Sequence, residues 1–114
     1  MKITASTEDR VTVLELDGNL TIGAADEAFS AAVDRQIEAG RADIVLDMER
    51  VGLVDSTGLG SLVRSHHRCV QSGGGLRLAN LDFHVWELIQ TAQIAGVIPI
   101  FENLQAALKG AGED

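Results

Sequence analysis

Short apolar runs alternate along this chain with longer segments in which apolar residues recur every three or four positions. Residues 11–16 are β-branched and partly alternating, which predicts a strand, and a first strand is expected near Ile3. From Ala24 the period changes to four residues, and this predicts an amphipathic helix that ends at Gly40. The apolar stripe of that helix consists of Ala25, Phe29, Val33 and Ile37.

The alternation continues to the end of the chain. The later predicted elements are strands at residues 44–46, 76–79 and 97–100 and helices at residues 57–72, 85–92 and 104–108. Pro99 has no N–H to donate to a ladder, so the last strand is expected at a sheet edge. Strands that alternate with helices predict an α/β fold, with a mixed sheet of four to five strands and about four helices, mainly on one side of the sheet.

The length of the chain sets the number of domains. With 114 residues it is long enough for one hydrophobic core and too short for two. We expect a single domain over residues 1–109 and a loose tail over residues 110–114.

Composition excludes several classes of protein. No apolar run approaches the roughly 20 residues that span a bilayer, and the start, MKITASTEDR, lacks the apolar core of a secretory signal. Cys69 is the only cysteine, which rules out an internal disulfide and fits a reducing cytoplasm. Cysteine and histidine form no cluster at metal-ligand spacing, so we expect neither a metal nor a cofactor.

The charge of the chain is acidic. The formal net charge is −8, and the nine lysine and arginine residues are scattered. Nucleic acid would repel such a surface, because binding to nucleic acid depends on clustered cations that neutralise phosphates. We expect an acidic domain of this kind to meet another protein, and neither nucleic acid nor a membrane.

The segment LVDSTGLGSLV, residues 53–63, places a carboxylate and two hydroxyls where a strand is expected to give way to a helix. The simplest interpretation is a helix cap, because the oxygens of Asp55 or Ser56 can accept hydrogen bonds from the free N–H groups of the first turn. A cap does not explain Gly58 and Gly60, since glycine costs up to about 1 kcal/mol relative to alanine inside a helix. Glycines at these positions leave the backbone bare, so that something large can approach it closely.

Three enzymatic interpretations fit this spacing poorly. GLGSLV resembles the start of a dinucleotide-binding G-x-G-x-x-G, but Val63 occupies the position of the third glycine. Ser61 lies outside the G-x-S-x-G turn of hydrolases. Asp-Ser-Thr-Gly has one residue too many for the Asp-Thr/Ser-Gly of aspartic proteases. We therefore expect no enzymatic activity from the chain itself.

A hydroxyl that another protein modifies fits the position better. A phosphate on Ser56 would lie at the positive end of the helix dipole, a contact worth on the order of 0.3–1 kcal/mol at a surface. The phosphate would add about −1.5 to −2 charges at neutral pH, and the neighbouring Asp55 would oppose it. Repulsion of this kind can switch a docking surface off.

The order V-D-S-T-G-L-G, after a strand and at the start of a helix, resembles the signature of the STAS domain family, in particular the bacterial anti-sigma-factor antagonists. The likeness extends over nearly the whole chain. It includes VTVLELDGNLT, which resembles the second and third strands of the family, IVLDMERVGLVDSTGLGSLV, GGGLRLANL and the closing IFENLQAAL. The resemblance implies a small single-domain STAS-like α/β fold in a bacterial, cytoplasmic protein.

The resemblance also implies a function. In the family, an anti-sigma factor that is also a serine kinase, of the GHKL ATPase type, phosphorylates the residue directly after the aspartate, which is Ser56 here. The unphosphorylated protein binds this kinase and releases a sigma factor to regulate transcription, and a PP2C-type serine phosphatase resets the switch. The residues that the resemblance places at the partner surface are Thr21, Asp55, Thr57, Gly58, Leu59 and Gly60.

One position departs from the family. Several antagonists carry an acidic residue in the loop after the early strands, where this chain reads Gly18-Asn19-Leu20-Thr21. Thr21 cannot supply that charge, so the efficiency of phosphorylation at Ser56 and the type of kinase stay open. Two other functions stay open as well, namely a scaffold subunit of a larger STAS-containing signalling assembly and a ligand-sensing STAS module.

Side chains outside the motif have structural interpretations. His66 lies on the apolar stripe of the predicted 57–72 helix, so we expect a half-buried histidine that binds no ligand. Trp86 is expected to anchor the core. The other side of the 57–72 helix is expected to be a solvated face that could border the partner surface, and it carries Ser61, Arg64, Ser65 and Arg68.

Overall fold

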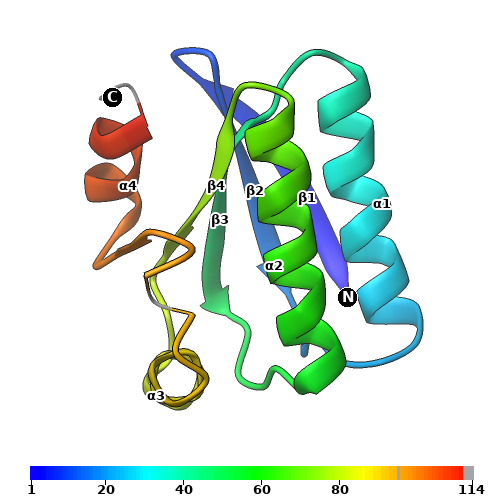
Figure 1. Ribbon diagram of the computed structural model, residues 1–114, viewed down its shortest axis with the longest axis vertical. Helices are drawn as coiled ribbons and strands as arrows, with labels where there is room; N and C mark the ends of the chain where they lie inside the picture. The colour runs from blue at the N-terminus through cyan, green and yellow to red at the C-terminus, as the bar shows by residue number, and fades with distance from the viewer. Residues whose placement is uncertain (95, 112–114) are drawn as a thin grey trace.

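The computed structural model describes residues 1–94 and 96–111. The elements follow the chain in the order β1 (Lys2–Glu8), β2 (Val11–Asp17), α1 (Ala24–Glu38), β3 (Asp43–Arg50), α2 (Ser56–Gln71), β4 (Gly75–Ala79), α3 (Phe83–Thr91), β5 (Ile100–Phe101) and α4 (Leu104–Ala111). Figure 1 shows one sheet with α1 and α2 packed side by side across it. The predicted α/β fold, a mixed sheet with five strands and four helices in these residues, is confirmed.

The sheet is antiparallel at one edge and parallel elsewhere. Its strand order is β1-β2-β3-β4-β5, with β1 antiparallel to β2 and every later pair parallel. Asp9 and Arg10 form the β1–β2 turn, and both have positive φ (47° and 74°), the backbone that a tight two-residue hairpin with twisted strands requires. Because β2, β3 and β4 are parallel and each is followed by a helix, their ends and the starts of α1, α2 and α3 lie together. We call this the carboxyl edge, which is at the bottom of Figure 1.

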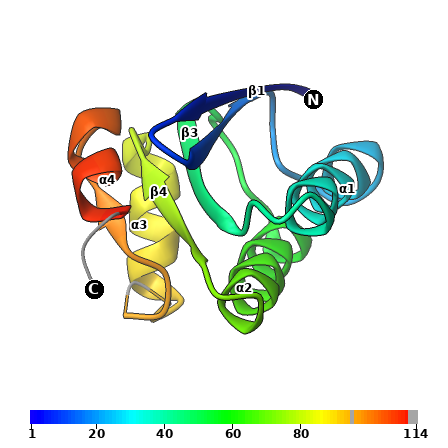
Figure 2. The ribbon, with the colours of Figure 1, turned by 90° about the horizontal axis from the view of Figure 1, so that it is seen from above.

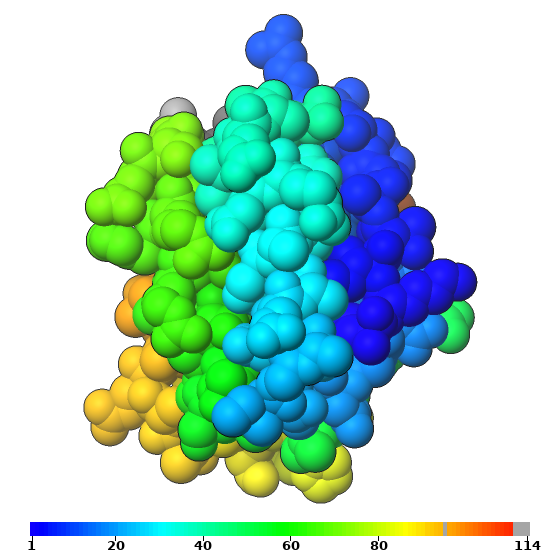
Figure 3. Space-filling model, turned by 90° about the vertical axis from the view of Figure 1, so that its right-hand side faces the viewer, coloured from blue at the N-terminus to red at the C-terminus, as the bar shows by residue number. Residues whose placement is uncertain are grey.

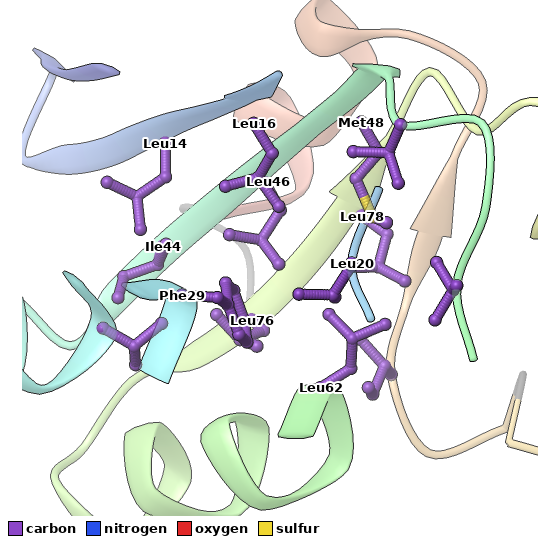
Figure 4. Close-up of a cluster of buried hydrophobic side chains, with 14 of the residues drawn as sticks. Leu14, Leu16, Leu20, Phe29, Ile44, Leu46, Met48, Leu62, Leu76 and Leu78 are labelled. Carbon is purple, nitrogen blue, oxygen red and sulfur yellow. The ribbon is translucent and has the colours of Figure 1, made fainter. Parts of the chain in front are cut away.

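One apolar core lies between the sheet and the two long helices. Phe29 of α1 and Leu62 of α2 are fully buried against the strands, and Val85 and Ile89 bring α3 to the same cluster. The strand side chains that meet them are Leu14, Leu16, Ile44, Leu46, Leu76 and Leu78, and Figure 4 shows how these converge on Phe29. The period-four stripe predicted for α1 is therefore the face that packs on the sheet.

The opposite face of the sheet carries a smaller core. Val11, Val13 and Val45 pack there with Ala79 and with Ala107 of α4. Figure 2 shows α4 across the sheet from α1 and α2. Strand residues are apolar on both faces of the sheet, and the second face is shielded from water by α4. The other three helices contribute to the larger core instead, and the helices are therefore not all on one side.

Three sequence expectations change in detail. The strand expected at residues 97–100 is reduced to β5, and Pro99 lies just before it, where its carbonyl accepts from Leu78 N at 3.0 Å. β5 is an edge strand as expected. In place of a separate third strand after β2, the structure has an isolated parallel bridge between Leu20 and Val54. Helix α4 continues through Ala111, and residues 112–114 of the expected tail lie outside the described residues.

Among residues 1–94 and 96–111, no helix is both long and apolar enough to cross a bilayer.

His66 joins α2 to β4. Its half-buried ring accepts a hydrogen bond from Leu76 N through Nδ1, at 3.0 Å. Burial lowers the pKa of His66, and the cation of Arg77 lowers it further. The expected half-buried histidine is confirmed, and its ring nitrogen is occupied within the fold.

Acid should destabilise the protein through His66. A histidine whose folded pKa lies below the unfolded value near 6.5 favours the neutral ring in the folded state. The unfolding free energy should therefore be highest above about pH 7 and fall as the pH drops through about 6.5 towards the folded pKa. Urea unfolding across this range should show the loss in wild type and in His84→Gln, an exposed control, but not in His66→Gln. The same pH dependence in His66→Gln would contradict this origin.

Candidate functional site

The predicted site residues gather at the carboxyl edge. Thr21 lies in the loop between β2 and α1, and Asp55 to Gly60 follow β3 and open α2. Leu20 N donates to the Leu53 carbonyl at 2.9 Å, and Asp55 N donates to the Leu20 carbonyl at 3.3 Å. Figures 1 and 3 both show the start of α2 beside the loop that enters α1, with α3 along the same edge. The two loops are thus joined through their backbones.

Asp55 connects these loops a second time through its side chain. Its Oδ1 accepts from Gly58 N at 2.8 Å, which caps α2, and its Oδ2 accepts from Ile22 N at 2.9 Å. The hydrogen bonds from Gly58 and Ile22 lower the pKa of Asp55. The carboxylate is therefore charged at neutral pH and holds the β2–α1 loop against the first turn of α2.

Ser56 is the first residue of α2 and is exposed. The predicted start at Thr57 is thus one residue late, and the cap is Asp55 rather than Ser56. In the described part of the chain the Ser56 hydroxyl makes no hydrogen bond, and the first turn of α2 holds no acidic residue. The hydroxyl stands free at the positive end of a helix dipole.

The two glycines of the motif have different surroundings. Gly58 is buried, and a Cβ there would overlap the carbonyl oxygen of Leu20. Gly58 is thus approached by the chain's own backbone, and not by a partner as its bare backbone suggested. Gly60 is half-buried, and the nearest atom to a Cβ would be the mobile end of Arg64, at 3.1 Å. Only Gly60 leaves room outside the fold.

The remaining residues predicted at the partner surface are Thr21, Thr57 and Leu59. All three are half-buried, and Leu59 packs against the main core. The carbonyl of Thr21 accepts from Asp26 N, in the first turn of α1, at 3.2 Å. The structure therefore brings Thr21 and Asp55 together through the intervening Ile22, and it places Thr57 and Leu59 directly after Ser56.

The face of α2 that was expected to be solvated partly forms the interface with α1, which we call the α1–α2 seam. Ser61 and Ser65 are buried against α1, with exposed fractions of 1% and 0%. Ser61 Oγ donates to Asp26, and Arg64 Nη2 donates to Ser61 Oγ at 3.1 Å. Polar pairs that span two helices leave no sequence signal on either helix alone, so this expectation for Ser61 and Ser65 is wrong.

Arg68 extends the same seam. Its guanidinium lies 3.0 Å from the Asp34 carboxylate of α1 and donates to Ser65 Oγ at 3.3 Å. Both charged side chains are more than a third exposed, so the pair contributes little to stability. Arg64, in contrast, remains exposed as expected.

Helix α3 presents a feature that sequence reasoning missed. Trp86 is 43% exposed and Phe83 is 63% exposed, so Trp86 is not the core anchor that was expected. The inward face of α3 is already filled by Val85 and Ile89. The spacing of those two residues was the signal, because Trp86 falls outside the stripe that they define.

A groove lies between α3 and the loop that precedes Asp55. Its volume is about 350 Å³. It is lined by Gly52, Leu53 and Val54 on one side and by His84, Val85, Glu87, Leu88 and Thr91 on the other. The groove therefore begins one residue before Asp55. We call the two hydrogen bonds that the Asp55 carboxylate accepts, from Gly58 N and Ile22 N, the Asp55 clamp.

The described residues offer little chemistry beyond this edge. They contain no group of three or more metal-ligating side chains. Burial raises the pKa of the Cys69 thiol to about 11, so the thiol is inert at neutral pH. The arrangement at the carboxyl edge thus presents a modifiable hydroxyl and a contact surface.

The sequence model of the STAS domain family matches residues 2–107. This chain belongs to the STAS domain family. The resemblance carried by V-D-S-T-G-L-G is thereby confirmed for the family. STAS domains are generally non-enzymatic binding modules, and the match extends over nearly all of the described chain.

Similar proteins of this family include anti-sigma factor antagonists. BtrV of Bordetella bronchiseptica, a candidate anti-sigma factor antagonist, is 26% identical over 107 residues, which cover 94% of this chain and 91% of BtrV. A candidate antagonist from Thermotoga maritima is 21% identical with a TM-score of 0.90, over 97% of this chain and 95% of its own. The Bacillus protein SpoIIAA in its phosphorylated form is 20% identical with a TM-score of 0.72, over 96% and 99%.

The fold alone does not select one function. It also occurs in a sulfate transporter family protein from Wolinella succinogenes, which is 23% identical with a TM-score of 0.78, over 94% of this chain and 88% of that one. The fold of this chain is thus that of the anti-sigma factor antagonists, and its activity has to be argued from the site.

Gly58→Ala should destabilise the protein, whereas Gly60→Ala should not. The added methyl at residue 58 meets the Leu20 backbone, which cannot swing away, and overpacking of this kind costs about 1–3 kcal/mol. At residue 60 the Arg64 side chain can move aside, and alanine favours a helix by up to about 1 kcal/mol. Thermal unfolding followed by circular dichroism compares the two variants. Equal melting temperatures would show that Leu20 does not press on Gly58.

Asp55→Asn should free the β2–α1 loop while keeping the helix cap. The asparagine oxygen can still accept from Gly58 N, but its amide group cannot accept from Ile22 N. Amide hydrogen exchange should therefore become faster at Ile22 and stay slow at Gly58. Asp82→Asn, which alters the cap of α3, is the control and should leave Ile22 unchanged. Unchanged exchange at Ile22 in Asp55→Asn would show that the carboxylate does not hold the loop.

Proposed function

We propose that this protein is an anti-sigma factor antagonist whose binding to an anti-sigma factor is switched off by phosphorylation of Ser56. The observation that carries the proposal is the exposed Ser56 hydroxyl at the start of α2, a helix capped by Asp55. The residue to be modified is thus not needed for the fold. The names of BtrV and of the Thermotoga maritima protein support the antagonist assignment, and the phosphorylated form of SpoIIAA supports modification on this fold.

The physical effect of the phosphate follows from its neighbours. At the start of α2 the helix dipole favours an added negative charge by on the order of 0.3–1 kcal/mol. The charged Asp55 carboxylate beside it acts in the opposite direction. A phosphate would bring about −1.5 to −2 further charges to a surface that already carries this carboxylate. The fold should tolerate the change, and a partner that docks over Ser56 should not.

The partner that we propose is an anti-sigma factor that is also a serine kinase of the GHKL ATPase type, with a PP2C-type serine phosphatase as the resetting enzyme. Thr21 carries no charge where several antagonists are acidic. The next acidic side chain, Asp26, is bonded to Ser61 within the α1–α2 seam and is not free to replace it. We therefore propose that the kinase contacts Asp55, Thr57, Leu59 and Gly60 around Ser56, with Thr21 at the border of the contact. Gly58 is buried and takes part only indirectly, by letting the Leu20 backbone pack beneath the first turn of α2.

Ser56→Ala and Ser56→Asp should separate the switch from the fold. Because Asp55 is the cap, Ser56→Ala should change stability by less than about 0.5 kcal/mol. Ser56→Asp places at the helix start a charge that the dipole favours and the neighbouring Asp55 carboxylate opposes, so stability should stay within about 1 kcal/mol of wild type. The same variant should bind the anti-sigma factor at least about tenfold more weakly, which corresponds to about 1.4 kcal/mol. Calorimetric titration measures the binding, and urea unfolding measures the stability.

The matched control is Ser6→Asp, which adds the same charge on exposed strand β1. It should bind like wild type. The kinase reaction is tested in parallel. The anti-sigma factor is incubated with ATP and either wild type or Ser56→Ala, and the phosphate is located by mass spectrometry. If wild type, Ser56→Ala and Ser56→Asp bind alike, Ser56 is only the first residue of a helix and the switch is excluded.

A further inference from the structure

Exposed apolar side chains gather at the carboxyl edge. Each parallel strand that ends there is followed by one, namely Ile22 after β2, Leu53 after β3 and Phe83 after β4, and these are 73%, 54% and 63% exposed. Trp86 adds a fourth on the outer side of α3. Isolated exposed apolar residues are ordinary, but a group of large ones at one edge marks an interaction surface.

The aromatic pair on α3 is the strongest part of this group. The rings of Phe83 and Trp86 stack with their centroids 6.1 Å apart and an angle of 24° between their planes. The chain has only three phenylalanines, one tryptophan and no tyrosine, so half of its aromatic residues form this exposed pair. Tryptophan is one of the residue types enriched among the energetically dominant residues at the centres of protein interfaces. The core does not require these rings, since Val85 and Ile89 fill the inward face of α3.

Helix α3 is flanked by two grooves, and each of them contains an acidic side chain. The groove beside Leu53 contains Glu87, and the groove on the other side, between Trp86 and Phe101, contains Glu102. Asp82 caps the start of the helix. Among the residues that the structure describes, neither groove has a lysine or arginine in its lining. This surface fits a protein that offers an apolar side chain to the groove and basic side chains to its rim.

We propose that Leu53 with the groove beside it, together with the exposed rings of Phe83 and Trp86 on α3, binds the same partner that contacts Ser56. We call this surface the α3 anchor. The groove includes Leu53 and Val54 and so runs directly into the Asp55 clamp. A partner in a standard interface covers about 800 Å² on each protein, enough to span adjacent loops of one sheet edge. The α3 anchor supplies affinity that does not depend on phosphorylation. The identity of the partner rests on the proposed function.

A second exposed apolar pair serves as the matched control. Val70 and Val97, 50% and 48% exposed, border a groove on the far part of α2 that is lined by Arg64, His67 and Arg68. Its charge is opposite to that of the α3 anchor, and it starts at Val63, away from the first turn of α2. A partner held by the α3 anchor leaves this groove uncovered.

The single tryptophan allows a direct test in the unmutated protein. The chain is labelled with 5-fluorotryptophan, which gives one fluorine signal, from residue 86. The probe is the purified protein that the wild-type chain retains from a lysate of its own cells. Addition of this protein should shift the signal and reduce its solvent accessibility. An unchanged signal in a saturated complex would overturn the α3 anchor, and retention of no protein at all would overturn both the anchor and the proposed function.

Substitutions then separate the anchor from the switch. Leu53→Ala and Trp86→Ala should each weaken binding at least about tenfold, whereas Val70→Ala and Val97→Ala should stay within about twofold of wild type. Phe83→Ala replaces Trp86→Ala if the latter does not fold. In a double-mutant cycle, Ser56→Asp should weaken binding by the same factor in wild type and in Trp86→Ala, because the anchor acts in both states.

The outcomes of this comparison are distinguishable. If the anchor variants bind like wild type and Ser56→Asp still binds weakly, the α3 anchor is wrong and the switch stands. If the anchor variants bind weakly and Ser56→Asp binds like wild type, the anchor stands and phosphorylation at Ser56 is not the control. Loss of binding in Val70→Ala and Val97→Ala alone would place the partner on the other groove and overturn the anchor.

Discussion

The carboxylate of Asp55 is the contact on which the arrangement of the carboxyl edge depends. One oxygen closes the first turn of α2 at Gly58, and the other holds Ile22 in the loop before α1. The Leu20 carbonyl fills the space below Gly58, so the two segments have no room to slide. A short side chain thus turns two loops that are more than thirty residues apart into one rigid surface.

This arrangement separates the chemistry of the site from the stability of the fold. Because Asp55 supplies the cap, Ser56 has no structural task and its hydroxyl faces solvent. Under the proposed function, a modification there would change the charge of the surface without touching the core that Phe29, Leu62 and the strands form.

Local patterns predicted most of the fold, and contacts between distant segments explain what they missed. The stripe from Ala25 to Ile37 predicted α1 because helix periodicity is a property of neighbouring residues. The burial of Ser61 depends on Asp26, which lies 35 residues earlier, and the requirement for glycine at residue 58 depends on Leu20. For the site, V-D-S-T-G-L-G located the edge and the family. It could not show that Asp55 would take the cap or that Trp86 would face outward.

The burial of the Cys69 thiol has consequences for oxidation of the protein and for its chemical labelling. With a pKa of about 11, only about one thiol in ten thousand is ionised at neutral pH, and the thiolate is the form that oxidants and alkylating reagents attack. Peroxide therefore has no reactive thiol through which to act on the folded domain. For the same reason, a cysteine introduced at an exposed position would be the sole site for thiol-reactive dyes, without removal of the native one.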